Sequence, residues 1–156
     1  MSRVSLDAID KKILSVLQDN ARIPNTELAD AVSLTPAPCL RRVKRLEEMG
    51  LIDGYVTLLN HEAVGRNFHV FVEVTLQKQT REVIDRFEAE VKKLPEVLEC
   101  YLITGDSDYL LRVAVEDMDA YQRFLMDHLT HIRDVDDIKS VIAMKQVKYS
   151  TKLPLD

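Results

Sequence analysis

One stretch near the start of the chain decides its first domain: Thr35-Pro36-Ala37-Pro38-Cys39-Leu40-Arg41-Arg42-Val43-Lys44-Arg45-Leu46. Thr before Pro is a favoured helix opening, because Thr caps the first turn and Pro needs no hydrogen-bond partner there. Leu40, Val43, Leu46 and Met49 recur at helical spacing, and Gly50 follows as a left-handed stop. We therefore expect a helix that buries these four apolar residues.

The same helix carries a concentrated positive charge. Residues 41–45 contain four cations and no acid, whereas the whole chain has a net charge of -5. Residues 1–60 are neutral, with eight Lys or Arg and eight Asp or Glu, so the negative charge lies entirely in residues 61–156. This balance excludes a chain that coats nucleic acid indiscriminately, but it leaves room for one local basic contact surface.

Two helices are expected upstream. The first is capped by Asp7 or Ser5, ends near Asn20 and has apolar residues at spacings of three or four, namely Leu6, Ile9, Ile13, Leu14 and Leu17. The second is capped by Asn25 or Thr26 and buries Leu28, Ala29 and Val32. Ser33-Leu34 then makes a tight connection to the cationic helix.

Two short helices joined by such a turn form a helix-turn-helix, here at about residues 25–45. The second helix of this motif enters the DNA major groove, and small residues at its leading end allow a close approach to base edges. We assign DNA contacts to Asn25, Thr26, Thr35, Pro36, Ala37, Arg41, Arg42, Lys44 and Arg45. The plainer interpretation is a solvated bundle helix whose Arg stems cover apolar neighbours.

A strand is expected after the third helix, because Ile52-Asp53-Gly54-Tyr55-Val56-Thr57-Leu58-Leu59 is rich in β-branched and aromatic residues. It would serve as a wing or as a connector. Residues 1–60 then form a winged helix-turn-helix domain, and residues 61–67 form a linker.

Residues 68–156 predict a second domain with four strands and two helices. The strands are expected at about residues 68–76, 97–104, 109–115 and 135–148, and Gly105-Asp106-Ser107-Asp108 makes the hairpin turn between the second and third. The first helix, capped by Thr80, presents Val83, Ile84, Phe87, Val91 and Leu94, and the second presents Tyr121, Phe124, Leu125, Leu129 and Ile132. This order is that of a ferredoxin-like βαββαβ unit, so the fold class is α+β.

The sheet of this domain should have a second face that is too apolar for water. We place Phe71, Tyr101, Ile103, Ile138 and Ile142 on it. A patch of this kind predicts dimerisation through the sheet.

Four blocks of sequence resemble the Lrp/AsnC family of transcription regulators over nearly the whole chain. They are Leu6-Asp7-Ala8-Ile9-Asp10-Lys11-Lys12-Ile13-Leu14, residues 35–47 as quoted above with Glu47, Gly50-Leu51-Ile52-Asp53-Gly54-Tyr55, and Thr104-Gly105-Asp106-Ser107-Asp108-Tyr109-Leu110-Leu111. The chain is most similar to the leucine-responsive branch.

The resemblance implies a DNA reader joined to a domain that dimerises, often assembles into an octamer of four dimers, and binds an amino-acid effector. The implied effector residues are Tyr101, Leu102, Thr104, Gly105, Asp106, Asp108 and Tyr109. Asp106 and Asp108 could receive an α-ammonium group, and backbone N–H groups of the turn could hold a carboxylate. The two acids could equally do no more than shape the turn. Leucine or methionine is the expected effector, although Ser107 occupies a position that varies in the family.

Other chemistry finds little support. His128 and His131 lack a third metal ligand at suitable spacing, a cation bound by Asp106 and Asp108 alone would be held weakly, and we expect no metal or cofactor. Cys39 and Cys100 are expected to be buried small residues, and no catalytic dyad or phosphate-binding glycine loop is present.

These observations predict a cytoplasmic DNA-binding regulator that is not an enzyme, since the sequence contains neither a spanning segment nor a secretory signal. The alternative is an amino-acid-sensing module that regulates a partner enzyme by protein contact. A small enzyme built on the second domain ranks last, because only the acidic turn offers titratable groups.

Overall fold

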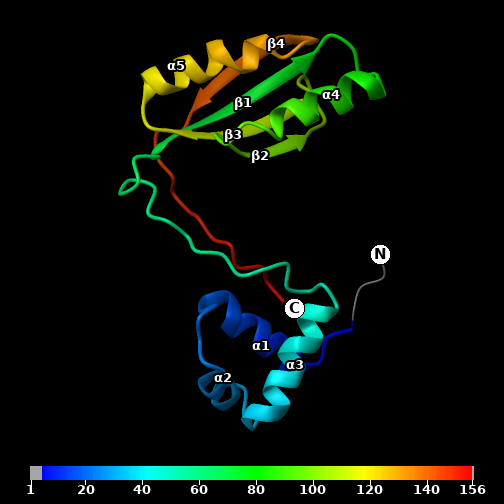
Figure 1. The fold of residues 1–156 in the computed structure, drawn as a ribbon, viewed down its shortest axis with the longest axis vertical. Coiled ribbons are helices and arrows are strands. Elements are labelled where there is room, and N and C mark those ends of the chain that lie inside the picture. Colours follow the sequence, from blue (N-terminus) through cyan, green and yellow to red (C-terminus); the bar gives the residue numbers. More distant parts are fainter. Residues whose placement is uncertain (1–4, 156) are drawn as a thin grey trace. The chain divides into compact units, whose positions relative to one another are not determined.

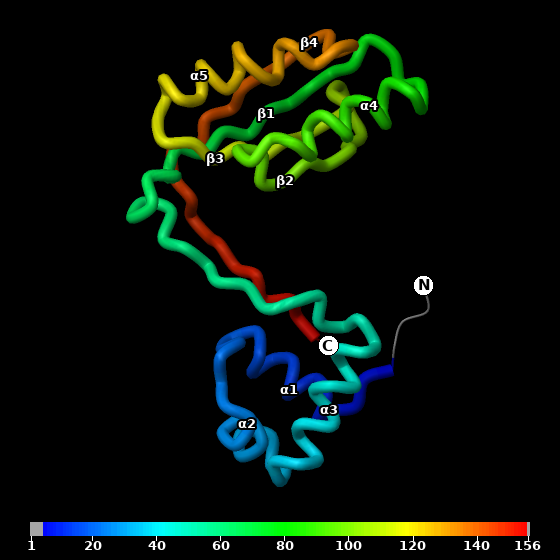
Figure 2. The backbone as a smooth tube through the Cα atoms, in the orientation of Figure 1, coloured from blue at the N-terminus to red at the C-terminus, as the bar shows by residue number. Residues whose placement is uncertain are grey.

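A computed structural model describes residues 5–155 (Figures 1 and 2). The chain divides into two compact units, one ending at Leu58 and the other covering Leu59–Val147, and residues 148–155 return to the first unit. In the described part no helix is both long enough and apolar enough to cross a membrane.

The first unit contains three helices, α1 (Ala8–Asp19), α2 (Asn25–Ala31) and α3 (Pro36–Glu48). Its buried core is Ile13, Leu14, Leu28, Ala29, Val32, Cys39 and Leu46. The three expected helices and the expected α2–α3 turn are therefore confirmed.

The helix ends follow from local chemistry. Asp7 caps α1 in a reciprocal capping box with Asp10. The expected cap of α2 is wrong: Pro24 takes this position without a side-chain bond, and Asn25 lies inside the helix. Thr35 does precede α3 in an extended conformation, but its hydroxyl makes no capping bond.

The α2–α3 turn depends on one strained residue. Ser33 has φ +60°, and Leu34 N–H donates to Ala29 C=O at 2.9 Å while Ser33 N–H donates to Asp30 C=O at 3.1 Å. This is a Schellman ending with Ser in the position that usually belongs to Gly. Gly50, at φ +66°, ends α3 in the same way, as expected.

Two of the four residues expected on the buried side of α3 are exposed. Leu40 and Met49 are each 44% exposed, whereas Cys39 and Leu46 are fully buried. The buried side runs through positions 39, 43 and 46, so Leu40 lies about a quarter turn away from it.

The strand expected at residues 52–59 is wrong. Residues 53–59 belong to no strand, and Tyr55, Val56, Leu58 and Leu59 are exposed. A strand needs the hydrogen bonds of a neighbouring backbone, and residues 5–155 offer none to this segment. The segment expected as a linker begins with a turn closed by the Asn60 side chain, whose Oδ1 accepts from Ala63 N–H at 3.1 Å.

The C-terminal residues also depart from expectation, since residues 148–155 were assigned to the second domain. Gln18 exchanges two hydrogen bonds with the backbone of Leu153, at 3.1 and 2.6 Å, and Lys152 Nζ lies 2.6 Å from Asp19 Oδ2. Leu155 packs on the helical core. These contacts attach the end of the chain to α1.

The second unit is a four-stranded antiparallel sheet with strand order β2-β3-β1-β4. Along the chain it consists of β1 (Phe68–Leu76), α4 (Arg81–Val91), β2 (Val97–Leu102), β3 (Tyr109–Val115), α5 (Met118–Asp127), the short 3-10 helix η1 (Leu129–His131) and β4 (Val135–Ile142). Both α-helices cover the same face of the sheet (Figure 1). The ferredoxin-like expectation is confirmed.

Some elements are shorter than expected. β4 ends at Ile142 rather than near residue 148, because its partner β1 begins at Phe68 and the last pair is Val70 with Ile142. The helix expected to reach Ile132 ends at Asp127 and continues only as the turn η1.

Alternate strand residues point to the helix-covered face, where Val70, Val72 and Val74 are fully buried. The other face, here called the open face, carries Phe71 and Tyr101 as expected. Ile138 and Ile142 do not belong to it: they pair with Val74 and Val70 and so share their face. Val141, opposite Phe71, takes the place expected for them.

Candidate functional site

The leading end of α3 is small and accessible. Thr35, Pro36 and Ala37 are all exposed, as is Thr26 on α2. The Asn25 side-chain amide donates to Pro36 C=O at 2.9 Å and thereby joins the starts of α2 and α3. Of these five expected DNA contacts, Asn25 is therefore already engaged within the protein, while the other four are free to meet a ligand.

The four cations of α3 fall into two pairs. Arg41 and Lys44 are exposed, and within residues 5–155 neither forms an ion pair. Arg42 and Arg45 instead bind acids on and before α1. Two of the four cations are thus free to bind a polyanion, and the other two are paired with acids of the same chain.

Asp10 is the centre of the held pair. Arg42 Nη1 lies 2.8 Å from Asp10 Oδ1 and 2.6 Å from Asp7 Oδ2, and Arg45 Nη2 lies 2.5 Å from Asp10 Oδ2. The Asp10 N–H group, followed by Arg42, lowers the pKa of Asp7, and hydrogen bonds to Asp7 and Asp10 raise the pKa of Arg42. We call Asp7, Asp10, Arg42 and Arg45 the α1–α3 ion cluster.

The α1–α3 ion cluster was missed in the sequence because its acids lie 32 to 35 residues from its cations. The sequence pattern around Asp7 predicts only a helix cap. The available signal was the pair of acids one helical turn apart in the first block, which places a second carboxylate beside the cap.

The turn between β2 and β3 holds four of the seven expected effector residues. Thr104, Gly105 and Asp106 are exposed, and Gly105 has φ +130°, a value that L side chains rarely adopt. Ile103 N–H donates to Asp108 C=O at 2.9 Å, which closes the hairpin. The turn presents an exposed carboxylate, Asp106, beside its backbone.

Asp108 has a structural partner of its own. Its Oδ2 accepts from Leu76 N–H at 2.7 Å and its Oδ1 from Gln79 Nε2 at 3.2 Å. Because Leu76 is buried, the carboxylate satisfies a main-chain donor at the end of β1. This geometry favours the shaping role for Asp108.

The remaining three expected effector residues do not form one surface, although Leu102 is paired with Tyr109 between β2 and β3. Tyr101 is on the open face, and its hydroxyl donates to Glu99 at 2.9 Å. Leu102 is an exposed edge residue on the helix-covered side. Tyr109 is 1% exposed, donates to Glu88 at 3.0 Å and has its pKa raised by burial, so it belongs to the core.

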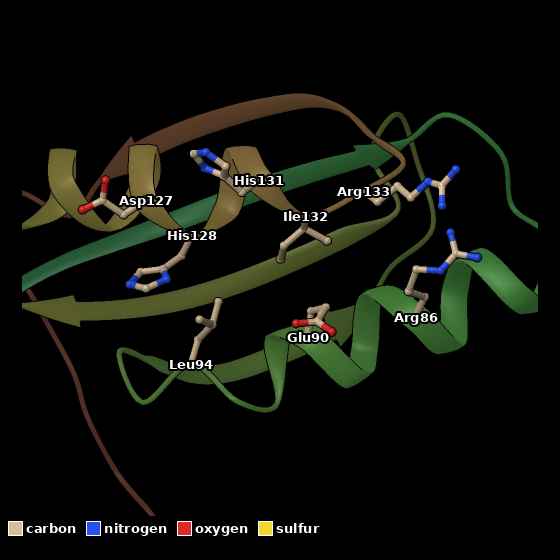
Figure 3. A pocket seen from close by; sticks show the side chains of 8 residues that line it. All are labelled: Arg86, Glu90, Leu94, Asp127, His128, His131, Ile132 and Arg133. Carbon is tan, nitrogen blue, oxygen red and sulfur yellow. The ribbon is translucent and has the colours of Figure 1, made fainter.

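A groove of about 340 Å³ separates α4 from the end of α5. Figure 3 shows Leu94 and Ile132 between its walls, with the guanidinium groups of Arg86 and Arg133 toward one end and His128 toward the other. Arg86 is already paired with Glu82 and Asp134. His128 and His131 both line this groove, yet no group of three metal-ligating side chains occurs among the described residues. No pattern in the sequence predicts this groove.

The open face combines apolar side chains with ion pairs. Phe71, Tyr101 and Val141 are 38%, 54% and 43% exposed. Arg112 binds Glu99 at 2.6 Å, and Lys139 binds Glu73 at 3.2 Å. Of the two cysteines, Cys39 is buried as expected. The expectation for Cys100 is wrong: it lies on β2, an edge strand of the sheet, and is exposed in this chain.

Comparison with known protein families gives two matches that together span both units. Residues 6–53 match the model described as winged helix-turn-helix DNA-binding. Residues 69–153 match the model described as the Lrp/AsnC ligand binding domain.

Individual relatives agree with these matches. The leucine-responsive regulatory protein of Escherichia coli K12 is 45% identical over 148 residues, which cover 95% of this chain and 90% of the relative. A transcriptional regulator from Neisseria meningitidis, solved as a complex with L-Met, is 41% identical with a TM-score of 0.93, covering 97% of this chain and 98% of that one. An AsnC family regulator from Agrobacterium tumefaciens is 40% identical with a TM-score of 0.92, covering 96% and 97%.

Proposed function

The chain belongs to the Lrp/AsnC family of DNA-binding transcriptional regulators with an amino-acid-binding domain, and we propose how its own residues divide this work. Helix α3 enters the DNA major groove, the sheet pairs two copies, and the β2–β3 turn receives the effector. The observation that carries the proposal is the exposed leading end of α3, flanked by two cations that have no partner in the described chain.

Within α3 the DNA contacts have different roles. Thr35, Pro36 and Ala37 are small enough to approach base edges, where sequence is read. Arg41 and Lys44 contact phosphates, which position the helix without specifying sequence. Thr26, at the start of α2, contacts the phosphate backbone of the DNA as well.

The open face pairs with a second copy of the chain. Large apolar side chains that are one-third to one-half exposed are costly to leave in water over a whole sheet face, and self-pairing covers them on both copies at once. A symmetric dimer presents two α3 helices to half-sites about 34 Å apart or a multiple of this. Four such dimers form the proposed octamer.

The effector is an amino acid, and leucine or methionine is proposed. The Neisseria meningitidis relative was solved with L-Met, and the present turn offers backbone N–H groups and the exposed carboxylate of Asp106. Asp106 is assigned the α-ammonium group, because Asp108 already accepts two hydrogen bonds. Thr104 and Gly105 shape the site, and Leu102 and Tyr101 contribute apolar surface on either side.

The deciding experiment measures fluorescence anisotropy of the protein on a duplex from upstream of its own gene, across salt concentrations and with each amino acid in turn. We expect specific binding that weakens with salt and is altered by leucine or methionine. An Arg133→Ala variant serves as a control for the α4–α5 groove: if it alone loses the response to amino acids, the effector binds in the groove. The alternative function, docking on a partner enzyme, requires that no salt-dependent DNA affinity is found.

Replacing both Arg41 and Arg45 by Ala should weaken DNA binding and flatten its dependence on salt. Each lost phosphate contact lowers the slope of log affinity against log salt by about 0.9. Since Arg45 is bound to Asp10, Arg41→Ala should account for most of the change. An unchanged slope in the double variant would remove both residues from the phosphate contacts.

A further inference from the structure

Asp10 connects helix α1 directly to the helix that faces DNA. Asp10 is 1% exposed, and it is the one charged residue that is buried within residues 5–155. It lies on α1 and is not itself assigned to DNA, yet it binds two of the four cations of α3, Arg42 and Arg45.

This arrangement constrains α3 in addition to its apolar packing. A buried carboxylate is tolerated only when it is paired and hydrogen-bonded, and Asp10 meets this need with both guanidinium groups and with Asp7 N–H, at 3.4 Å. Arg42 and Arg45 are three residues apart, so they hold one side of α3 against α1. Rotating α3 about its axis would break both ion pairs and leave the carboxylate without compensation.

The same contacts decide which cations are available. Arg42 and Arg45 are turned toward α1, whereas Arg41 and Lys44 are exposed without partners among the described residues. Asp10 therefore reduces the free positive charge of α3 from four groups to two. With fewer free cations, α3 is attracted less strongly to the phosphates of any DNA, while the leading end that contacts bases is unchanged. This combination favours discrimination between DNA sequences.

We propose that Asp10 is a positioning residue for DNA recognition, which holds Arg42 and Arg45 on α1 so that α3 presents its leading end and Arg41 and Lys44 in one orientation. The proposal rests on the proposed contact between α3 and DNA. It assigns to Asp10 an effect on sequence discrimination that exceeds its effect on total affinity.

The test is Asp10→Asn, which keeps the side-chain shape and removes the charge. Affinity is measured by anisotropy for the specific duplex and for a random duplex of equal length, over a range of salt concentrations. We expect the ratio of specific to random affinity to fall by about tenfold, the size of one lost base contact. Binding to random DNA should hold or tighten, and its salt slope should steepen by about 0.9 for each Arg that is released onto a phosphate.

Asp30→Asn is the matched control, because Asp30 is an exposed acid of α2 in the same unit and forms no ion pair in the described residues. It should leave the ratio unchanged. If Asp10→Asn fails to fold, Arg42→Lys keeps the charge but removes the guanidinium group, whose Nη1 binds both Asp7 and Asp10. This variant should change the ratio in the same direction by less.

Two results would overturn the inference. Equal losses on specific and random DNA in Asp10→Asn would show that Asp10 acts only through stability, and an unchanged ratio in a folded variant would show that it does not orient α3. Absence of salt-dependent DNA binding in the unmodified protein is a different failure, since it would overturn the proposed function itself.

Discussion

The two faces of the sheet are formed by the same four strands but differ in how far their side chains are buried. On the helix-covered face Val70, Val72 and Val74 are fully buried beneath α4 and α5. On the open face, Phe71 and Val141 stand half-exposed between ion pairs. The covered face is complete within one chain, whereas the open face is the surface proposed to pair with a second copy. A pattern of alternating residues therefore reports which side chains share a face, but not what covers that face.

The largest effect is expected on the covered face. Phe87 is fully buried, and its ring lies 4.6 Å from that of Tyr109, centroid to centroid. Phe87→Ala should lower the free energy of unfolding by about 3 to 5 kcal/mol, because it removes a large side chain and leaves a cavity. Urea denaturation measures this loss, which should be the same at every protein concentration. Phe71→Ala, on the open face, should instead show a loss that grows with protein concentration, because it weakens association.

The next largest effect is expected from a charge on the open face. Phe71→Glu places a carboxylate opposite Arg112, so the single chain still folds, but a second copy must then bury that charge. We expect association to weaken by at least about thirtyfold, equal to the roughly 2 kcal/mol of an interface hot spot. Light scattering after size-exclusion chromatography measures the molecular mass.

Ala89→Glu is the matched control for this variant, because it adds the same charge at an exposed position of α4. A Phe71→Glu protein that keeps the native mass would exclude the open face as the pairing surface.

A smaller effect separates the two acids of the β2–β3 turn. Asp108→Ala leaves the buried Leu76 N–H without its acceptor, which should cost about 1 to 3 kcal/mol of stability. Asp106→Ala should leave the stability unchanged and reduce the response of DNA binding to leucine or methionine. If DNA binding by Asp108→Ala still responds to the effector as in the native protein, Asp108 has only a structural role. If DNA binding by Asp106→Ala still responds in this way, the assigned effector site is wrong.

Most of the architecture was predictable from the sequence because it depends on neighbours in the chain. The apolar spacing of α1, α4 and α5, the caps at Asp7 and Thr80, and the Gly50 stop are all local. The same holds for the alternation of β1. Local signals of this kind can be recognised within a window of about ten to fifteen residues.

What failed depends on register and on distant partners. The face of Ile138 and Ile142 is set by the pairing of β4 with β1, which shifts between Thr75 and Leu76 and follows a turn at Asp134 with φ +70°. A shift of one residue exchanges the two faces of a strand, and no sequence pattern in β4 reveals it. The attachment of residues 148–155 to α1 has the same origin, since it joins positions more than 130 residues apart.

In the candidate site, residue types were predicted better than their roles. The basic cluster on α3 was found, but two of its four cations are engaged by acids that precede it by more than 30 residues. The acidic turn was found as well, but Asp108 is bonded to the end of β1. In both cases the sequence does not show which charged side chains are free to meet a ligand, because it does not show which ones are paired within the protein.

The smallest predicted effect concerns the pH dependence of the open face. Burial lowers the pKa of His69, helped by His61, whose ring centroid is 5.0 Å away, and by Arg112. In the unfolded chain the pKa of His69 returns to about 6.5, so the unfolded state binds more protons between the two values. The free energy of unfolding should therefore fall as the pH falls through about 6.5 toward the lower, folded value.

Urea denaturation at several pH values between about 7.5 and 5.5 measures this fall, and His69→Gln should reduce it. His131→Gln is the control, since His131 is exposed and lies on the other side of the sheet beside the α4–α5 groove. Equal pH dependence in the native protein and His69→Gln would remove His69 as the cause. If a second copy covers the open face, it desolvates His69 further, so the same fall should be steeper in the native assembly than in the Phe71→Glu chain. A steeper fall in the native assembly would show that the pairing of two sheets lowers the pKa of His69 further.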